Sequence, residues 1–150
     1  MGKLFLSGGG SEDQTIAIDR IFVSGIMESK FDEVLKGYVD GGGVVYGGSA
    51  GAIIFGNNIL TSAHLDINTV EVEDFKGMGM IGNYSVWCHF KKNNDRLINR
   101  FVAEYDSSVI ALPEETAIFI DGSEKKVIGT EPAYIFTNKG IKSITGNFSL

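Results

Sequence analysis

The sequence contains little cysteine, proline and histidine: one cysteine, two prolines and two histidines among 150 residues. Because Cys88 has no second cysteine to pair with, no internal disulfide forms, and this predicts a protein of the reducing cytoplasm. A single cysteine and two separated histidines make no metal-ligand cluster. We therefore expect neither a metal centre nor a cofactor.

Basic residues and long apolar runs are also scarce. The chain has 13 Lys and Arg residues against 19 Asp and Glu residues, a formal net charge of −6, and no basic cluster, so nucleic acid is not an expected partner. No apolar run approaches the length that spans a membrane, and we expect no membrane association. Residues 1–6 contain one lysine and too short an apolar run for a signal peptide, so none is expected. Residues 1–150 are expected to form a single domain.

Glycine, by contrast, is abundant with 20 residues, and glycine-rich segments divide the chain into short elements. Strands are predicted at residues 3–7, 44–46, 69–72, 84–88 and 109–112, and helices at residues 16–22, 31–39, 52–55 and 95–105. Two hairpins follow, one pairing 116–121 with 126–130 and the other pairing 133–137 with 142–145. Alternating strands and helices that give way to hairpins predict an α/β fold.

Two of these segments carry further information. The predicted helix 31–39 is amphipathic, with Phe31, Val34, Leu35 and Tyr38 on one side. The glycine run at residues 8–10 follows the first strand and lies before a helix, a place where backbone N–H groups can cradle an anion. It lacks the phosphate-loop pattern, so we interpret it as a simple turn between strand and helix.

The segment Gly47-Gly48-Ser49-Ala50-Gly51 fits the nucleophile-elbow pattern G-x-S-x-G. A predicted strand precedes it and an apolar helix follows it, which is the context that the motif requires. The serine of such an elbow has a strained backbone, and small residues two positions away on either side keep the arms of the turn apart. Free N–H groups at the start of the helix can stabilise an oxyanion. The alternative is a glycine-rich turn that binds a phosphate or nothing; the context favours a nucleophile.

A serine nucleophile needs a base within hydrogen-bond reach and a third group that orients the base. His89 follows an apolar strand, which is where catalytic groups of α/β sheets are found, whereas His64 lies in a polar loop. We therefore interpret His89 as the base. The orienting acid is Glu114 or Glu115, which directly follow a Leu-Pro pair, or Asp66.

Three blocks of sequence resemble the peptidase E family, which comprises aspartyl dipeptidases and cyanophycinase-like serine peptidases. The blocks are Gly47-Gly48-Ser49-Ala50-Gly51-Ala52, Trp87-Cys88-His89-Phe90 and Ala111-Leu112-Pro113-Glu114-Glu115, and the opening Leu4-Phe5-Leu6-Ser7-Gly8-Gly9-Gly10 is similar to the first strand and loop of the family. The resemblance implies a three-layer α/β/α sandwich with a mostly parallel sheet, like that of class I glutamine amidotransferases, in which a serine replaces the amidotransferase cysteine.

The same resemblance implies residue roles. Ser49 is the nucleophile, His89 the general base and Glu114 the orienting acid, with Asp66 as the alternative acid, and the Ala50 N–H is an oxyanion donor. The implied activity is that of a serine peptidase that hydrolyses short peptides through an acyl-enzyme, with Asp-X dipeptides as the candidate substrates.

The chain departs from the family in length. Around residues 23–25 it lacks the further strands and helices of longer members, together with a glycine-rich loop whose N–H is the second oxyanion donor. The shortened chain is expected to leave apolar surface bare at residues 4–6 and 44–46, and therefore to form a homodimer. With one oxyanion donor, weak turnover is expected.

Two other functions remain as alternatives. The first is a catalytically impaired remnant that acts as a binding or assembly module, which the missing loop favours. The second is an amidotransferase-like domain, which is disfavoured because the elbow carries serine and Cys88 lies outside the elbow.

Overall fold

A computed structural model of the chain describes residues 2–9, 29–62 and 74–150. The predicted helix 16–22, the predicted strand 69–72, His64 and Asp66 lie outside the described residues. The fold of the described part is α/β, as the order of predicted elements indicated. Within it, no helix has the length and apolar character needed to cross a membrane.

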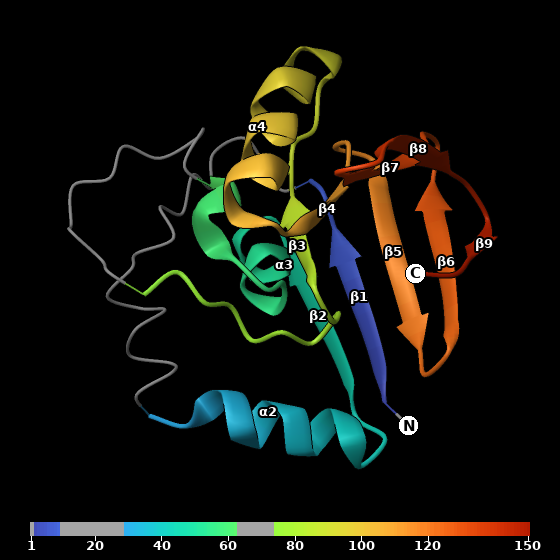
Figure 1. Ribbon diagram of the computed structural model, residues 1–150. Coiled ribbons are helices and arrows are strands. Elements are labelled where there is room, and N and C mark those ends of the chain that lie inside the picture. The colour runs from blue at the N-terminus through green and yellow to red at the C-terminus, as the bar shows by residue number, and fades with distance from the viewer. Residues whose placement is uncertain (1, 10–28, 63–73) are drawn as a thin grey trace.

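The strands form two sheets. The first contains β1 (Lys3–Ser7), β2 (Val44–Gly48), β5 (Thr116–Asp121), β6 (Glu124–Gly129) and β9 (Asn147–Phe148), and the second contains β3 (Tyr84–Trp87), β4 (Ser108–Ala111), β7 (Ala133–Thr137) and β8 (Gly140–Ile144). The strand orders are β2-β1-β5-β6-β9 and β3-β4-β7-β8 (Figure 1). The helices are α2 (Phe31–Asp40), α3 (Ala50–Phe55) and α4 (Asp95–Tyr105), with short 3-10 turns η1 (Ile59–Ser62) and η2 (Lys92–Asn94).

Both sheets are mixed, so the expectation of a mostly parallel sheet is wrong. β1 runs parallel to β2 and β3 runs parallel to β4, whereas β1–β5, β4–β7 and the hairpin pairs are antiparallel. The cause is the run of hairpins after α4. Parallel neighbours need a long crossover, usually a helix, and no helix follows α4 in residues 106–150, so β5 and β7 join their neighbours antiparallel.

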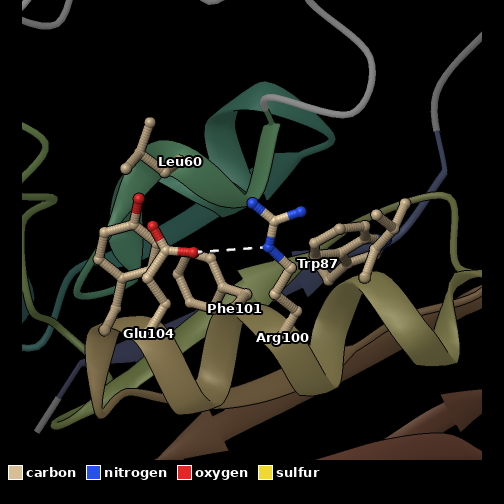
Figure 2. Close-up of a pocket in the computed structure, with 7 residues that line it drawn as sticks. Leu60, Trp87, Arg100, Phe101 and Glu104 are labelled. Carbon is tan, nitrogen blue, oxygen red and sulfur yellow. Dashed lines mark ion pairs between the residues drawn. The ribbon is translucent and has the colours of Figure 1, made fainter.

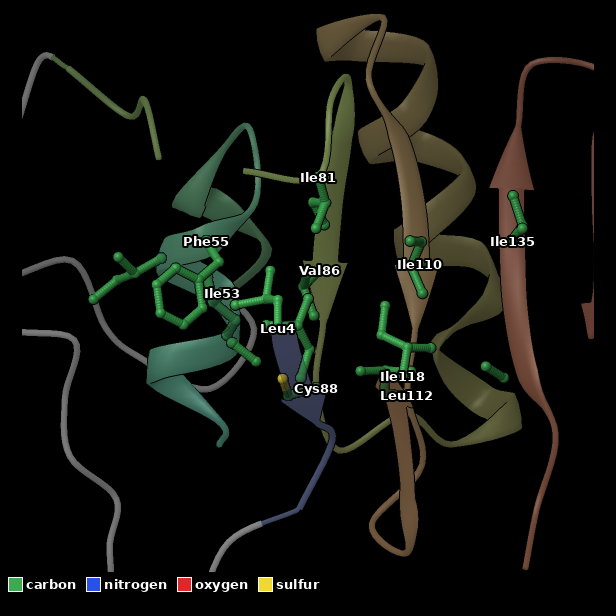
Figure 3. Close-up of a cluster of buried hydrophobic side chains, with 14 of the residues drawn as sticks. Leu4, Ile53, Phe55, Ile81, Val86, Cys88, Ile110, Leu112, Ile118 and Ile135 are labelled. Atoms are coloured by element: carbon green, nitrogen blue, oxygen red, sulfur yellow. The ribbon is translucent and has the colours of Figure 1, made fainter. Parts of the chain in front are cut away.

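The β3–β4 pair lies between two helices. Alternate residues of a strand face opposite sides of its sheet. Val86 and Ile110 belong to the larger buried cluster, which includes Ile53 of α3 (Figure 3). Trp87 and Val109 belong to a second buried cluster with residues of α4. Helix α3, the β3–β4 pair and helix α4 therefore form three layers, with one buried cluster on each face of the strand pair. Strands β3 and β4 end at an edge that both clusters border.

One apolar surface of the described residues stays exposed. It consists of Phe31, Val34 and Tyr38 on α2 and Val44 and Tyr46 on β2, whose side chains are between 49% and 67% exposed; we call it the α2–β2 surface. Helix α2 is thus amphipathic as predicted, but most of its apolar side remains uncovered. Among the strands that the structure describes, β2 is at the edge of its sheet, in the same region (Figure 1).

The first strand differs from expectation. Leu4 and Leu6 were expected to be bare, but they are only 3% and 0% exposed. The reason is that β1 has a strand on each side, β2 and β5, while its inward-facing leucines join the cluster formed with α3. Of the residues expected to be bare, only Val44 and Tyr46 of β2 have the predicted exposure.

Candidate active site

Ser49 occupies the turn between β2 and α3. Its backbone has φ 47° and ψ −113°, a conformation that is strained for a residue with a side chain. A Cβ added at Gly47 would lie 2.5 Å from the Phe55 ring and 2.7 Å from the Gly51 carbonyl oxygen, so this position requires glycine. A Cβ at Gly51 would meet nothing within 4 Å, so the predicted crowding exists on only one side of the elbow.

His89 lies just after β3 and approaches Ser49 from the second sheet. Its Nε2 atom is 2.8 Å from the Ser49 Oγ atom. The His89 backbone also has a positive φ of 54°, and its N–H donates to the Gly8 carbonyl oxygen at 2.9 Å. Two residues in sparsely populated backbone conformations thus face each other, and such strain is concentrated at functional sites.

Glu114 completes a chain of three side chains. Its Oε1 atom is 2.5 Å from His89 Nδ1, whereas Glu115 turns away and accepts a hydrogen bond from Thr130 Oγ1 at 3.0 Å. An ionised carboxylate can only accept hydrogen bonds, so His89 Nδ1 is the donor and Nε2 is left to accept the Ser49 hydroxyl proton. The sequence left three candidates for the acid that contacts His89. In the structure, Glu114 makes this contact.

The site is open to solvent on the side of His89 and Glu114. The His89 side chain is 23% exposed and the Glu114 side chain is 48% exposed. Ala50 is the first residue of α3, where the initial N–H groups have no partner inside the helix. The Ser49 hydroxyl and the His89 ring therefore lie together at the start of α3.

The sequence model of peptidase family S51 matches residues 21–128. The chain belongs to peptidase family S51. This confirms the resemblance that was drawn from the three sequence blocks. A search of curated proteins gives no match.

Solved structures place the S51 chain among peptidase folds. A putative peptidase E from Listeria monocytogenes EGD-e is similar with 20% identity and a TM-score of 0.59, over 73% of this chain and 55% of that one. A peptidase from an acI-B1 Actinobacterium is similar with 15% identity and a TM-score of 0.62, over 100% of this chain and 97% of that one. The S51 chain therefore spans about half of the first structure and nearly all of the second.

Cys88 of the S51 chain lies beneath the elbow but is not a nucleophile. It is fully buried, and its Sγ atom is 3.4 Å from the Ser49 carbonyl oxygen and 3.7 Å from that of Ser7. Burial, and to a smaller extent the charge of Glu114, raises the pKa of the Cys88 thiol far above its usual range. The thiol therefore stays neutral and donates weakly to the elbow backbone, which argues against cysteine-based chemistry.

A separate pocket of about 460 Å³ lies on the α4 side of β3. Figure 2 shows its lining residues, which are Leu60, Trp87, Leu97, Arg100, Phe101, Glu104 and Tyr105. Arg100 and Glu104 form an exposed ion pair across it, at 3.7 Å. This pocket is lined by none of Ser49, His89 and Glu114. Within the described residues, no group of three or more His, Cys, Asp or Glu side chains is arranged to hold a metal ion.

Proposed function

We propose that this S51 chain is a serine peptidase in which Ser49 is the nucleophile, His89 the general base and Glu114 the acid that orients it. The observation that carries the proposal is the unbroken line of contacts from Ser49 Oγ through His89 to Glu114, with separations of 2.8 and 2.5 Å. Nucleophile, base and orienting group at these distances form the recognised arrangement for acyl transfer.

The proposed reaction has two halves. Ser49 Oγ bonds to the peptide carbonyl carbon while its proton passes to His89 Nε2, and the resulting oxyanion accepts a hydrogen bond from the Ala50 N–H. His89 then gives the proton to the leaving amine as the C–N bond breaks, which leaves an ester on Ser49. Water attacks this ester and loses a proton to His89, which passes the proton to Ser49 Oγ as the ester C–O bond breaks, so that the peptide acid is released and Ser49 and His89 are restored.

For the substrate we propose a short peptide, with Asp-X dipeptides as the first to be tested. Membership of family S51 and the resemblance to aspartyl dipeptidases support this choice. The chain requires no metal in this scheme, and its single buried cysteine supports a cytoplasmic location. One positioned oxyanion donor in place of two predicts turnover that is lower by about 10²–10³-fold.

One observation favours a second candidate function, that of an impaired peptidase fold which acts as an assembly module. The α2–β2 surface exposes five large apolar side chains next to an edge strand. Such a surface is typical of an interface. We propose that two copies of this chain meet there in a homodimer, an arrangement compatible with either function.

A fluorophosphonate probe, which reacts with activated serines, tests the proposal without a known substrate. We expect the wild-type chain to be labelled, Ser49→Ala to escape labelling, and the exposed-serine control Ser143→Ala to be labelled like the wild type. Hydrolysis of Asp-X dipeptides should follow the same order, with unchanged free energies of unfolding. If the folded wild-type chain is neither labelled nor hydrolytic, the assembly function replaces the peptidase.

A further inference from the structure

Three consecutive residues at the end of β1 each contact a different member of the Ser49–His89–Glu114 line. The Ser7 carbonyl oxygen accepts from the Ser49 N–H at 3.1 Å, and the Gly8 carbonyl oxygen accepts from the His89 N–H at 2.9 Å. Gly9 lies against Glu114 so closely that no side chain fits between them. We propose that residues 7–9 are positioning residues for the triad, and we call them the β1 clamp.

The two glycines of the clamp are required by close packing. A Cβ added at Gly9 would lie 2.1 Å from the Glu114 carbonyl oxygen and 2.8 Å from its Oε2 atom, and one added at Gly8 would lie 2.3 Å from the carbonyl oxygens of Leu112 and Pro113. Real Cβ contacts stay above 3.0 Å, so a side chain at Gly9 requires a relative shift of about 0.9 Å between residue 9 and Glu114, the difference between 3.0 and 2.1 Å. The absence of a side chain at Gly9 thus leaves the space that Glu114 occupies beside His89.

The position of the clamp explains why one segment reaches all three groups. β1 lies between β2, which leads into Ser49, and β5, which begins two residues after Glu114. His89 comes from the other sheet, and its bond to the Gly8 carbonyl joins the two sheets at the site. Gly8 is itself fixed by donating its N–H to the Thr116 carbonyl oxygen at 2.9 Å. The clamp therefore contacts Ser49, His89 and Glu114 from one short segment.

The catalytic consequence rests on the proposed function. A misplacement of about 1 Å in a catalytic constellation can lower the rate about 10²-fold. A side chain at Gly9 should act through Glu114 on His89, because the acid that selects the His89 tautomer is the group that the added Cβ would meet. Reaction at Ser49 should then slow even though Ser49 and His89 are unchanged.

The test compares Gly9→Ala with Gly2→Ala. A Cβ at Gly2, at the opposite end of β1, would lie 2.1 Å from the Val39 carbonyl oxygen, so the control variant creates an equal backbone collision far from the triad. We expect Gly9→Ala to slow fluorophosphonate labelling of Ser49 about 10²-fold. Gly2→Ala should lose stability and label at the wild-type rate. Equal labelling of the two variants would overturn the proposal.

A second readout separates this proposal from the peptidase itself. In chains whose histidines carry a stable nitrogen isotope, the ring-nitrogen shifts of His89, assigned with His64→Gln, report which nitrogen holds the proton. Wild type and Gly2→Ala should show a proton fixed on Nδ1, and Gly9→Ala should show mixed tautomers. This outcome supports the clamp even if no labelling occurs, while a fixed tautomer in Gly9→Ala refutes it.

If Gly9→Ala does not fold, hydrogen exchange of the wild-type chain decides. The N–H groups of Ser49 and His89 should exchange as slowly as those inside the β1–β5 ladder, because both donate to the clamp. Exchange at the rate of an open loop would show that residues 7–9 do not hold them, and the proposal would be wrong.

Discussion

Replacing Glu114 by glutamine should slow reaction at Ser49 by removing a charge while keeping the shape of the side chain. In the proposed mechanism His89 becomes an imidazolium during attack, and the Glu114 carboxylate, 2.5 Å from Nδ1, would stabilise that charge. Two unit charges about 4 Å apart interact by about 1 kcal/mol in water and about 4 kcal/mol near a protein surface. Because the Glu114 side chain is 48% exposed, solvent screens it, and we expect the lower part of this range.

A loss of about 1.4–2.7 kcal/mol corresponds to labelling that is 10- to 100-fold slower. The neighbouring Glu115 provides the matched control. Its side chain contacts Thr130 instead of His89, so Glu115→Gln removes the same charge one residue away from Glu114 and leaves the contact to His89 in place. The assay is the rate of fluorophosphonate labelling in Glu114→Gln, Glu115→Gln and Asp66→Asn. The reasoning fails if Glu114→Gln reacts at the wild-type rate, or if Asp66→Asn is the slower variant.

Three further outcomes follow from the structure. Because burial raises the pKa of the Cys88 thiol, the unfolded chain releases the thiol proton above about pH 9 while the folded chain keeps it. The free energy of unfolding in urea should therefore fall by up to about 1.4 kcal/mol per pH unit above that pH. Cys88→Ala should lack this contribution to the slope. Tyr46→Lys combined with Val34→Glu should convert the expected dimer to a monomer in light scattering, whereas a wild-type monomer would contradict the interface. Ile110→Ala, at a fully buried site, should cost about 2–5 kcal/mol in urea unfolding, far more than Ile128→Ala at a 43% exposed site.

The sequence predicted the local elements of the site well because each has a local signature. The elbow around Ser49 is marked by glycines between a strand and a helix, and His89 follows an alternating apolar strand. Helix 95–105 and strand 3–7 have the predicted bounds, and both hairpins form at the glycine-containing turns. The choice of Glu114 over Glu115 came from the family resemblance, and in the structure Glu114 contacts His89 whereas Glu115 contacts Thr130.

Long-range pairing had no such signature. No pattern within residues 116–121 predicts that this strand pairs with β1. That pairing makes the sheet mixed and buries Leu4 and Leu6. Amphipathicity revealed that one side of α2 is apolar, but a pattern within one helix does not say whether another element covers that side. The contacts of Gly8 with His89 and of Gly9 with Glu114 were missed for the same reason, since these partners are more than 80 residues away.

The place of β1 between β2 and β5 also sets the order of events during synthesis. β1 leaves the ribosome well before β5, the strand that completes its pairing and begins at Thr116, and Glu114 emerges only just before that strand. Contacts between such distant segments form late because closing a long loop costs entropy before it returns any energy. A growing chain therefore carries Ser49 and His89 without an assembled site until residues 114–121 have been made. Any hydrolytic activity would begin only after β5 has been synthesised.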